Sequence, residues 1–158
     1  MTSDEFFEEN QRTFDLIFID GLHLAEQVLR DVYNSLAVLN SGGALLLHDC
    51  NPVDERAQTR NVDLAEGSTW NGDTWKVIAF LRCQRPELFT RVVDLDYGVG
   101  IVIPGKTAKR SVLADDLETA DRLFSELTYE ELEQDRGQTL GLVTLRGLEA
   151  ELAELGIW

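Results

Sequence analysis

Short apolar runs alternate with a longer segment of helical periodicity in the first third of the chain. Leu16–Ile19 and Ala44–Leu47 contain only apolar residues, a pattern typical of strands that are buried on both faces. From Ala25 to Leu39, apolar residues recur at spacings of three and four, and polar residues fill the opposite side, which predicts an amphipathic helix. A strand, a helix and a strand in this order predict a βαβ unit with parallel strands and a right-handed crossover.

Local signals set the expected ends of these elements. Gly42-Gly43 follows the periodic segment, so we expect these glycines to end the helix and turn the chain. A short helix is expected from Ser3 to about Gln11, with Ser3 as its N-cap and Asp4 favoured in its first turn. The first strand would therefore be preceded by a helix.

The remainder of the chain predicts a long polar loop, a helix, a hairpin and a helical tail. Only Tyr97-Gly98 separates the two hairpin strands, which predicts a tight antiparallel turn. The tail from Leu113 onward is acidic, and Thr128-x-x-Glu131 has the form of a capping box. The expected ranges are 53–72 for the loop, 73–84 for the helix, 90–96 and 99–103 for the strands, and 148–155 for a last helix.

Together these elements predict an α/β fold with a mostly parallel sheet and one antiparallel strand. We expect residues 1–105 to form this unit and residues 106–158 to form a helical tail that packs on it or on a partner. The chain of 158 residues is long enough to bury a core of its own.

Charge narrows the classes of partner. The net charge is −15, and the longest basic cluster is Lys106–Arg110, so neither nucleic acid nor an anionic membrane is expected as a partner. No apolar run reaches the length of a membrane span, and the acidic N-terminus does not resemble a signal peptide. We therefore expect a cytoplasmic protein. Cys50 and Cys83 form no CxxC pair and no zinc spacing.

Polar side chains follow both predicted strands where each one ends. Asp20 and His23 come after the first strand, and His48 and Asp49 come after the second. Ligands in open α/β sheets bind outside the carboxyl ends of the strands. Carboxylates suit Mg²⁺, and an imidazole can accept a proton near neutral pH. A metal-dependent hydrolase would use the same four residues, and carboxylates that merely orient loops or cap helices remain an alternative.

Aromatic and basic residues near the long loop are secondary candidates. Trp70 and Trp75 can line a substrate pocket, although Trp75 fits a core position equally well. Arg56 and Arg60 can bind an anionic substrate or remain solvated loop charges.

Several motifs occur in an order that resembles one enzyme family. They are Phe14–His23, Gly42-Gly43, His48–Pro52, Trp70–Lys76 and Tyr97–Gly100. This order is similar to the C-terminal half of class I S-adenosylmethionine (SAM)-dependent methyltransferases, in particular a subgroup that resembles sugar O-methyltransferases. The resemblance extends over about residues 2–104.

The resemblance implies a partial Rossmann-like sheet whose strands correspond to the family's strands 4, 5, 7 and 6 in spatial order. It also implies site residues: Ser3, Asp4 and Asp20 for SAM, Asp20, His48 and Asp49 for a divalent cation such as Mg²⁺, and His23 as general base. The family's Gly-rich cofactor loop is not matched, because no GxGxG occurs in this sequence. The isolated chain is therefore expected to bind little SAM and to show no turnover.

These features predict O-methyl transfer to a small hydroxylated acceptor. The alternative is a non-catalytic interaction module, because the first strand would form an exposed apolar edge. Such an edge can pair with a strand of another chain. A homo-oligomer, or a different partner that covers this edge, is therefore also expected.

Overall fold

A five-stranded sheet with the order β1-β2-β4-β3-β5 forms the framework of the protein. The structure is a computed structural model and describes residues 1–65, 69–106, 108 and 114–157. β1 is parallel to β2, β4 is antiparallel to both β2 and β3, and β3 is parallel to β5. The strands are β1 (Phe14–Ile19), β2 (Leu39–Leu47), β3 (Leu88–Val93), β4 (Val99–Pro104) and β5 (Leu142–Val143).

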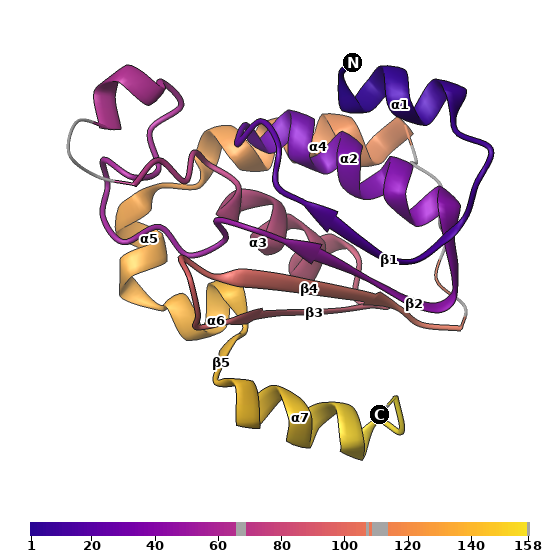
Figure 1. The fold of residues 1–158 in the computed structure, drawn as a ribbon. Coiled ribbons are helices and arrows are strands. Elements are labelled where there is room, and N and C mark those ends of the chain that lie inside the picture. Colours follow the sequence, from indigo (N-terminus) through magenta and orange to yellow (C-terminus); the bar gives the residue numbers. More distant parts are fainter. Residues whose placement is uncertain (66–68, 107, 109–113, 158) are drawn as a thin grey trace.

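Helices connect these strands and follow them (Figure 1). α1 precedes β1, α2 connects β1 to β2, α3 precedes β3, and α4 to α6 lead to β5 and the terminal α7. The helices are α1 (Ser3–Glu9), α2 (Ala25–Val38), α3 (Trp75–Gln84), α4 (Ala114–Glu126), α5 (Tyr129–Gln134), α6 (Arg136–Leu140) and α7 (Leu145–Glu154), and a 3-10 turn, η1, spans Val62–Ala65.

The α/β class and the βαβ unit are confirmed. The open, five-stranded sheet is compatible with a Rossmann-like methyltransferase sheet. β5 was not expected, because its two residues carry no strand pattern of their own and pair with Val92 and Val93 only in the folded chain. The Thr128 capping box is confirmed by reciprocal hydrogen bonds with Glu131.

The ends of several elements differ from the predictions. α2 ends at Val38 without glycine, and Gly42-Gly43 lies inside β2, opposite an irregularity in the β1–β2 register. A Cβ on Gly43 would lie 2.7 Å from the Asp15 carbonyl oxygen, so the close approach of β1 explains this glycine. The N-cap of α1 is Thr2 rather than Ser3, because Thr2 forms the capping box with Glu5.

The hairpin connection is also longer than predicted. β3 ends at Val93 and β4 begins at Val99, so five residues rather than two connect the strands. Asp96, Tyr97 and Gly98 all have positive φ angles of 43°, 61° and 88°. The predicted start of the tail at Leu113 lies outside the described residues, as do three positions of the basic cluster at 106–110.

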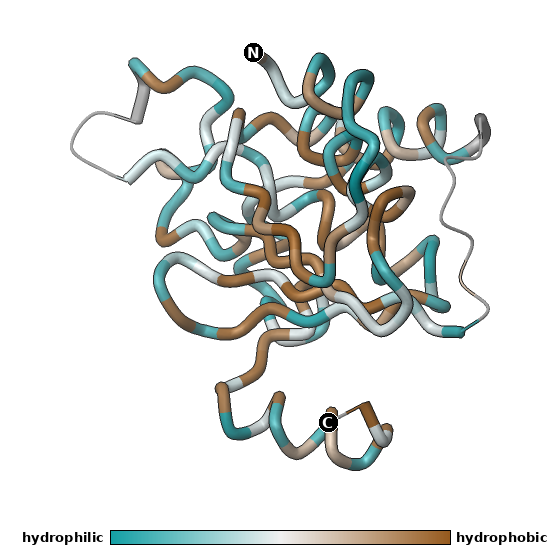
Figure 2. Tube along the Cα trace, turned by 45° about the vertical axis from the view of Figure 1, so that its right-hand side comes forward, coloured by the Kyte–Doolittle hydropathy of each residue, from teal (hydrophilic) through white to brown (hydrophobic). Residues whose placement is uncertain are grey.

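The core lies between the sheet and one layer of helices. Apolar residues line the chain segments in the centre of the molecule, and polar residues lie mainly on its periphery (Figure 2). α2 and α3 supply most of the helix side of the core, with fully buried Leu36 and Phe80, and the strands supply Leu45 and Leu47. Burying each such side chain contributes about 1.5–3 kcal/mol. None of the described helices is long and apolar enough to cross a membrane.

The tail contributes to both faces of the sheet. Phe124 of α4, Leu132 of α5 and Leu140 of α6 belong to the main core. α7 instead packs on the opposite face, where Leu148 and Leu152 contact Val93. α7 is thus the helix that covers the β3 side of this face.

Candidate functional site

The carboxyl ends of β1 and β2 bring four predicted residues together. The His48 amide donates a hydrogen bond to the Ile19 carbonyl oxygen at 3.0 Å, which holds the two strand ends in register. Asp20 and His23 leave β1, and His48 and Asp49 leave β2. Two strands that are parallel neighbours therefore place both acid–histidine pairs at one edge of the sheet.

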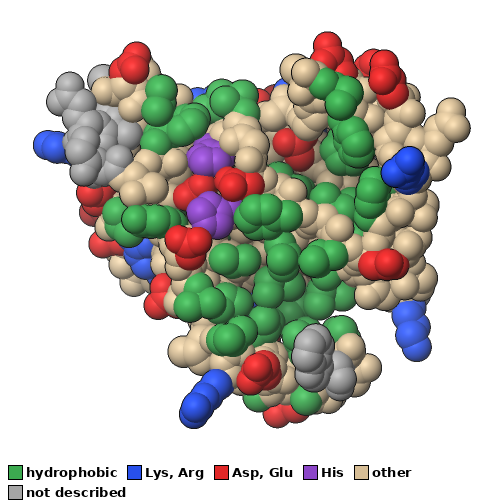
Figure 3. Space-filling model, viewed as in Figure 1, with side chains coloured by type: hydrophobic (Ala, Val, Ile, Leu, Met, Phe, Trp, Pro, Cys, Tyr) green, Lys and Arg blue, Asp and Glu red, His purple; other side chains and the backbone are tan. Residues whose placement is uncertain are grey.

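Carboxylates and imidazoles alternate in this strand-end cluster, which we define as Asp20, His23, His48, Asp49 and Asp96. His23 Nε2 lies 3.4 Å from Asp20 Oδ1 and 3.3 Å from Asp49 Oδ2. His48 Nδ1 lies 3.0 Å from Asp49 Oδ2 and 3.7 Å from Asp20 Oδ1, and its Nε2 lies 3.2 Å from Asp96 Oδ2. Figure 3 shows the two histidines with acidic side chains between them, beside a broad apolar surface.

The long loop positions His23 from the other side. The Trp70 ring stacks on His23 with a centroid distance of 5.1 Å and an interplanar angle of 27°. His23 Nδ1 lies 3.2 Å from the Trp70 carbonyl oxygen. Since a carbonyl oxygen only accepts hydrogen bonds, Nδ1 is the donor in this contact, and Nε2 faces the carboxylates. The loop therefore fixes the orientation of the His23 ring.

Asp49 is the most constrained member of the cluster. It is 4 % exposed and has a φ of 60°, which costs a non-glycine residue energy unless its surroundings enforce it. The fully buried Asn71 donates a side-chain hydrogen bond to its Oδ1. The Asp49 carboxylate thus has one oxygen fixed by the loop, and its Oδ2 faces both histidines.

The donor set of the cluster fits a divalent cation. Asp20, His23 and Asp49 each offer one ligand atom, and these atoms lie within 4.8 Å of one another. His23 Nε2 faces two carboxylate oxygens, and a cation between these three atoms would bind Nε2 in its unprotonated form. Two carboxylates and an imidazole suit Mn²⁺, Fe²⁺ or Zn²⁺ better than Mg²⁺.

His48 has a different environment, because both its ring nitrogens face carboxylates. Burial lowers the pKa of His48, but hydrogen bonds with Asp49 and Asp96 outweigh burial and raise this pKa above its usual value. The protonated ring donates from both nitrogens. A metal ion at His48 would therefore have to displace a proton and a hydrogen bond.

Cys50 and Asn51 lie next to the cluster without joining it. Cys50 is fully buried, and burial raises the pKa of its thiol, so this cysteine is an unreactive core residue. Asn51 connects three segments: its Nδ2 donates to Asp94 Oδ1 at 3.3 Å, and its Oδ1 accepts from Arg136 Nη1 at 2.5 Å. The Asn51 amide also donates to the Tyr97 carbonyl oxygen at 2.7 Å.

Two of the predicted cofactor residues line one cavity. A cavity of about 280 Å³ lies between α1, β1 and α2, and Ser3 and Asp20 are both in its wall. Asp4 is not in this wall but accepts a hydrogen bond from Gln27 Nε2 at 3.3 Å, and Gln27 also donates to Ser3 Oγ. A site for a whole drug-sized ligand has about 300–1,000 Å³, so this cavity has room for only part of such a molecule.

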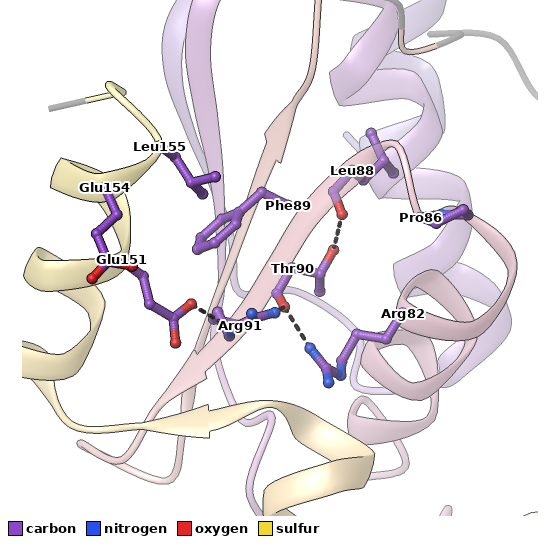
Figure 4. Close-up of a pocket in the computed structure, with 9 residues that line it drawn as sticks. All are labelled: Arg82, Pro86, Leu88, Phe89, Thr90, Arg91, Glu151, Glu154 and Leu155. Carbon is purple, nitrogen blue, oxygen red and sulfur yellow. Dashed lines mark hydrogen bonds and ion pairs between the residues drawn. The ribbon is translucent and has the colours of Figure 1, made fainter.

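A larger cavity lies away from the cluster, between α7 and β3 (Figure 4). Its volume is about 560 Å³, and Phe89 and Leu155 give it an apolar wall. Arg91 Nε pairs with Glu151 Oε2 across it at 2.8 Å. None of the predicted site residues lines it.

Some residues that support the cluster could not be identified from their own sequence signals. Asn71 was noted only within a motif and Asp96 only as the end of a predicted strand. No spacing rule connects either of them to His48 or Asp49. Arg60 was a candidate for anionic substrates, but its guanidinium pairs with Glu26 and Asp73, each at 2.6 Å. Trp75 is fully buried and is a core residue.

Comparison with known proteins gives a family match for the segment that contains four of the five cluster residues. Residues 1–50 match the model of a protein family described as "Methyltransferase domain". A search of curated proteins finds no match to this chain. The matched segment contains α1, β1, α2 and β2, together with Asp20, His23, His48 and Asp49. This match supports a methyltransferase-like function, which suggests the use of SAM.

Proposed function

We propose that the strand-end cluster is the acceptor and cation side of a SAM-dependent methyltransferase site. The reaction is methyl transfer to a hydroxyl oxygen of a small acceptor such as a sugar. One observation carries this proposal: carboxylate oxygens of Asp20 and Asp49 lie 3.0–3.7 Å from ring nitrogens of both His23 and His48, inside the segment that matches a methyltransferase domain.

Each residue has a chemical role in this proposal. Asp20 and Asp49 hold a divalent cation, which lowers the pKa of an acceptor hydroxyl when it is bound. His23 accepts the hydroxyl proton at Nε2, because the Trp70 carbonyl oxygen keeps the other proton on Nδ1. Asn71 holds the Asp49 carboxylate in place by its hydrogen bond to Oδ1.

Two nitrogens, His48 Nδ1 and His23 Nε2, are candidates for the nitrogen ligand of the cation. His48 Nδ1 is within 3.0 Å of Asp49 Oδ2, and His23 Nε2 is within 3.3 Å of the same atom. One nitrogen cannot bind a metal and accept a proton at the same time. His23 therefore acts as base only where His48 or water completes the coordination.

The cofactor side belongs to the cavity beside α1. Ser3 and Asp20 line this cavity, and the Gln27 amide connects Ser3 to Asp4. Because the sequence contains no GxGxG loop to bind the rest of the cofactor, we propose that the isolated chain binds SAM weakly and shows little turnover. Calorimetric titration tests this directly, and a micromolar SAM affinity would contradict it.

Titration with Mn²⁺ alone tests the cation site. We expect binding by the wild-type chain and at least a tenfold loss of affinity in Asp49→Asn and Asp20→Asn. Asp121→Asn, at an exposed position of α4, is the matched control and should leave the affinity unchanged. Equal affinities in all four proteins would refute the cation site.

The histidine variants separate the two roles. His23→Gln should lower Mn²⁺ affinity if Nε2 is a ligand, and should leave it intact if His23 is only a base. His48→Gln gives the same comparison for Nδ1. The expected result under this proposal is a loss in His48→Gln and retention in His23→Gln.

A second candidate function is a non-catalytic interaction module, which one observation favours. β1 is the edge strand of the sheet, and its Leu16 and Phe18 side chains are 58 % and 55 % exposed. Long apolar edges of this kind pair readily with other strands.

A further inference from the structure

On one face of the sheet, no helix of the described part of the chain covers β1 and β2. Alternate residues point to opposite faces, and Leu16 and Phe18 point away from the helix layer that buries Ile19. Phe18 is the register partner of Leu46, which is the partner of Ile101. This apolar row runs across the sheet toward α7, and Figure 3 shows it as a continuous apolar surface.

The outer edge of β1 carries backbone groups that no strand in the described part of the chain reaches. The Ile19 carbonyl oxygen accepts from His48 and so points toward β2. Because backbone groups of successive residues point in opposite directions, those of Phe14, Leu16 and Phe18 point outward. Three residues of the edge therefore offer N–H and C=O groups for another strand.

An apolar groove follows this edge. The groove has a volume of about 230 Å³ and is lined by Phe6 and Phe7 of α1 and by residues 14 and 16–18 of β1. Because α1 and β1 both line this groove, a strand added along it would contact both phenylalanines of the helix.

Two copies of β1 match each other well when they are placed side by side in antiparallel orientation. In an antiparallel pair of two β1 strands with Leu16 opposite Leu16, Phe14 lies opposite Phe18 at both ends. Phe14, Leu16 and Phe18 are the residues whose backbone N–H and C=O groups point away from β2. In this register, these groups of the two copies can bond to each other. Arg12 and Asp20 flank β1 on its two sides, and this register brings Arg12 of one copy near Asp20 of the other. The Arg12 backbone is hydrogen-bonded to the Asn10 side chain, so only its side chain takes part.

Charges favour this register over one in which the two Asp15 residues face each other. Arg12 and Asp20 are both exposed, and the described residues give the Arg12 side chain no ion pair. In this register Asp15 lies opposite Ile17, so the two Asp15 carboxylates do not face each other. Opposite charges therefore meet at both ends of the edge, and like charges do not meet along it.

We propose that a second copy of this chain pairs with β1 in an antiparallel, two-fold arrangement with Leu16 at its centre. The paired edge buries Phe14, Leu16 and Phe18 of both copies and leaves neither β1 edge exposed. It also places Arg12 of the second copy beside Asp20 of the strand-end cluster. The inference rests on the sheet edge and not on the proposed methyl transfer, so either can fail without the other.

The strength of the dimer follows from its size and charge. An interface formed by a six-residue strand edge buries less surface than the roughly 800 Å² per partner of a standard interface. We therefore expect a dissociation constant on the order of 10 μM. Each copy carries a net charge of −15, and added salt screens this repulsion. Association should therefore be at least as strong in 0.5 M NaCl, on the order of a 3 Å–5 Å screening length, as in 0.1 M NaCl.

Sedimentation equilibrium of the whole chain between about 2 and 200 μM tests the dimer. The expected mass rises from 17.8 kDa toward twice that value. Leu16→Lys places two ammonium groups opposite each other and should weaken association at least tenfold. Leu117→Lys, at a leucine of α4 that is 40 % exposed, is the matched control and should leave association unchanged.

Charge reversal tests the register itself. Arg12→Asp should weaken association because it places two carboxylates opposite each other, and Asp20→Arg should do the same with two guanidinium groups. The double variant restores the opposite charges and should recover most of the wild-type affinity. Circular dichroism of each variant checks that the fold is retained.

The outcomes are distinct. A wild-type chain that stays monomeric at 200 μM overturns the proposal. A dimer that persists unchanged in Leu16→Lys or Arg12→Asp forms through another surface and also overturns it. Mn²⁺ titration of the Leu16→Lys monomer shows separately whether the strand-end cluster still binds its cation.

Discussion

Asp73 connects the long loop to the first turn of α2, and its removal should destabilise both. α2 has no side-chain cap of its own, because its N-cap residue is Leu24. Asp73 Oδ1 instead accepts a hydrogen bond from the Ala25 amide at 2.8 Å. Its Oδ2 pairs with Arg60 of the loop at 2.6 Å, and its amide donates to the His23 carbonyl oxygen at 3.1 Å.

The cost of Asp73→Ala can be worked out from these contacts. Ala25 is fully buried, and a buried N–H without a partner costs about 1–3 kcal/mol. Loss of a negative charge at a helix N-terminus adds about 0.3–1 kcal/mol. Since the Arg60 side chain is 52 % exposed, its ion pair contributes at most about 1 kcal/mol. We expect a total loss of about 2–4 kcal/mol in the free energy of unfolding.

Asp73→Asn separates the hydrogen bond from the charge. Its Oδ1 still accepts from the Ala25 amide, so the expected loss is only about 1 kcal/mol. Urea unfolding followed by circular dichroism measures both variants. Asp63→Ala, at an exposed loop carboxylate, is the control and should change stability by less than about 0.5 kcal/mol.

The reasoning would be refuted by either of two results. A loss of stability in Asp73→Asn as large as that in Asp73→Ala would show that charge and not the amide hydrogen bond matters. Asp73→Ala could also cost less than about 0.5 kcal/mol, which would show that water or another group satisfies the Ala25 amide.

Three further predictions concern His48, the β3–β4 connection and the buried Arg85 ion pair. The pKa of His48 is raised in the folded state. The stabilisation from its charged ring is therefore complete below the unfolded pKa of His48 and is lost as pH rises through the folded pKa. Without metal, His48→Gln should cost more stability at pH 5.5 than at pH 8.5. Gly98→Ala should lower the unfolding free energy by more than about 2 kcal/mol, because Gly98 has a φ of 88° and a Cβ there would lie 2.5 Å from the Asn51 amide nitrogen. Arg85→Met should cost about 3–5 kcal/mol in thermal or urea unfolding, since Arg85 is 3 % exposed and pairs with Asp116 at 3.3 Å; a loss below about 1 kcal/mol would contradict this role.

The sequence determined the architecture where local pattern and burial agree. The apolar runs Leu16–Ile19 and Ala44–Leu47, with an amphipathic segment between them, predict a βαβ unit, which the structure contains. Burial on both faces was wrong for β1, because this strand lies at the edge of the sheet and its Leu16 and Phe18 are exposed. The same pattern determines which side chains follow the strands. Asp20 and His48 were therefore predicted to meet at the carboxyl ends of the two strands. Asp20 Oδ1 and His48 Nδ1 lie 3.7 Å apart.

Only the tertiary structure decided which distant groups complete the cluster and define its supports. Asp96 and Asn71 approach the β2 end through hairpin and loop conformations that need positive φ angles at Asp96 and Gly72. α2 is capped by a carboxylate 48 residues away in the sequence, from Asp73. Such contacts depend on chain segments that meet only after folding, and local periodicity contains no information on them. The sequence by itself determined the βαβ unit and the polar residues that follow its two strands; packing decided the fifth strand and the orientation, burial and partners of those side chains.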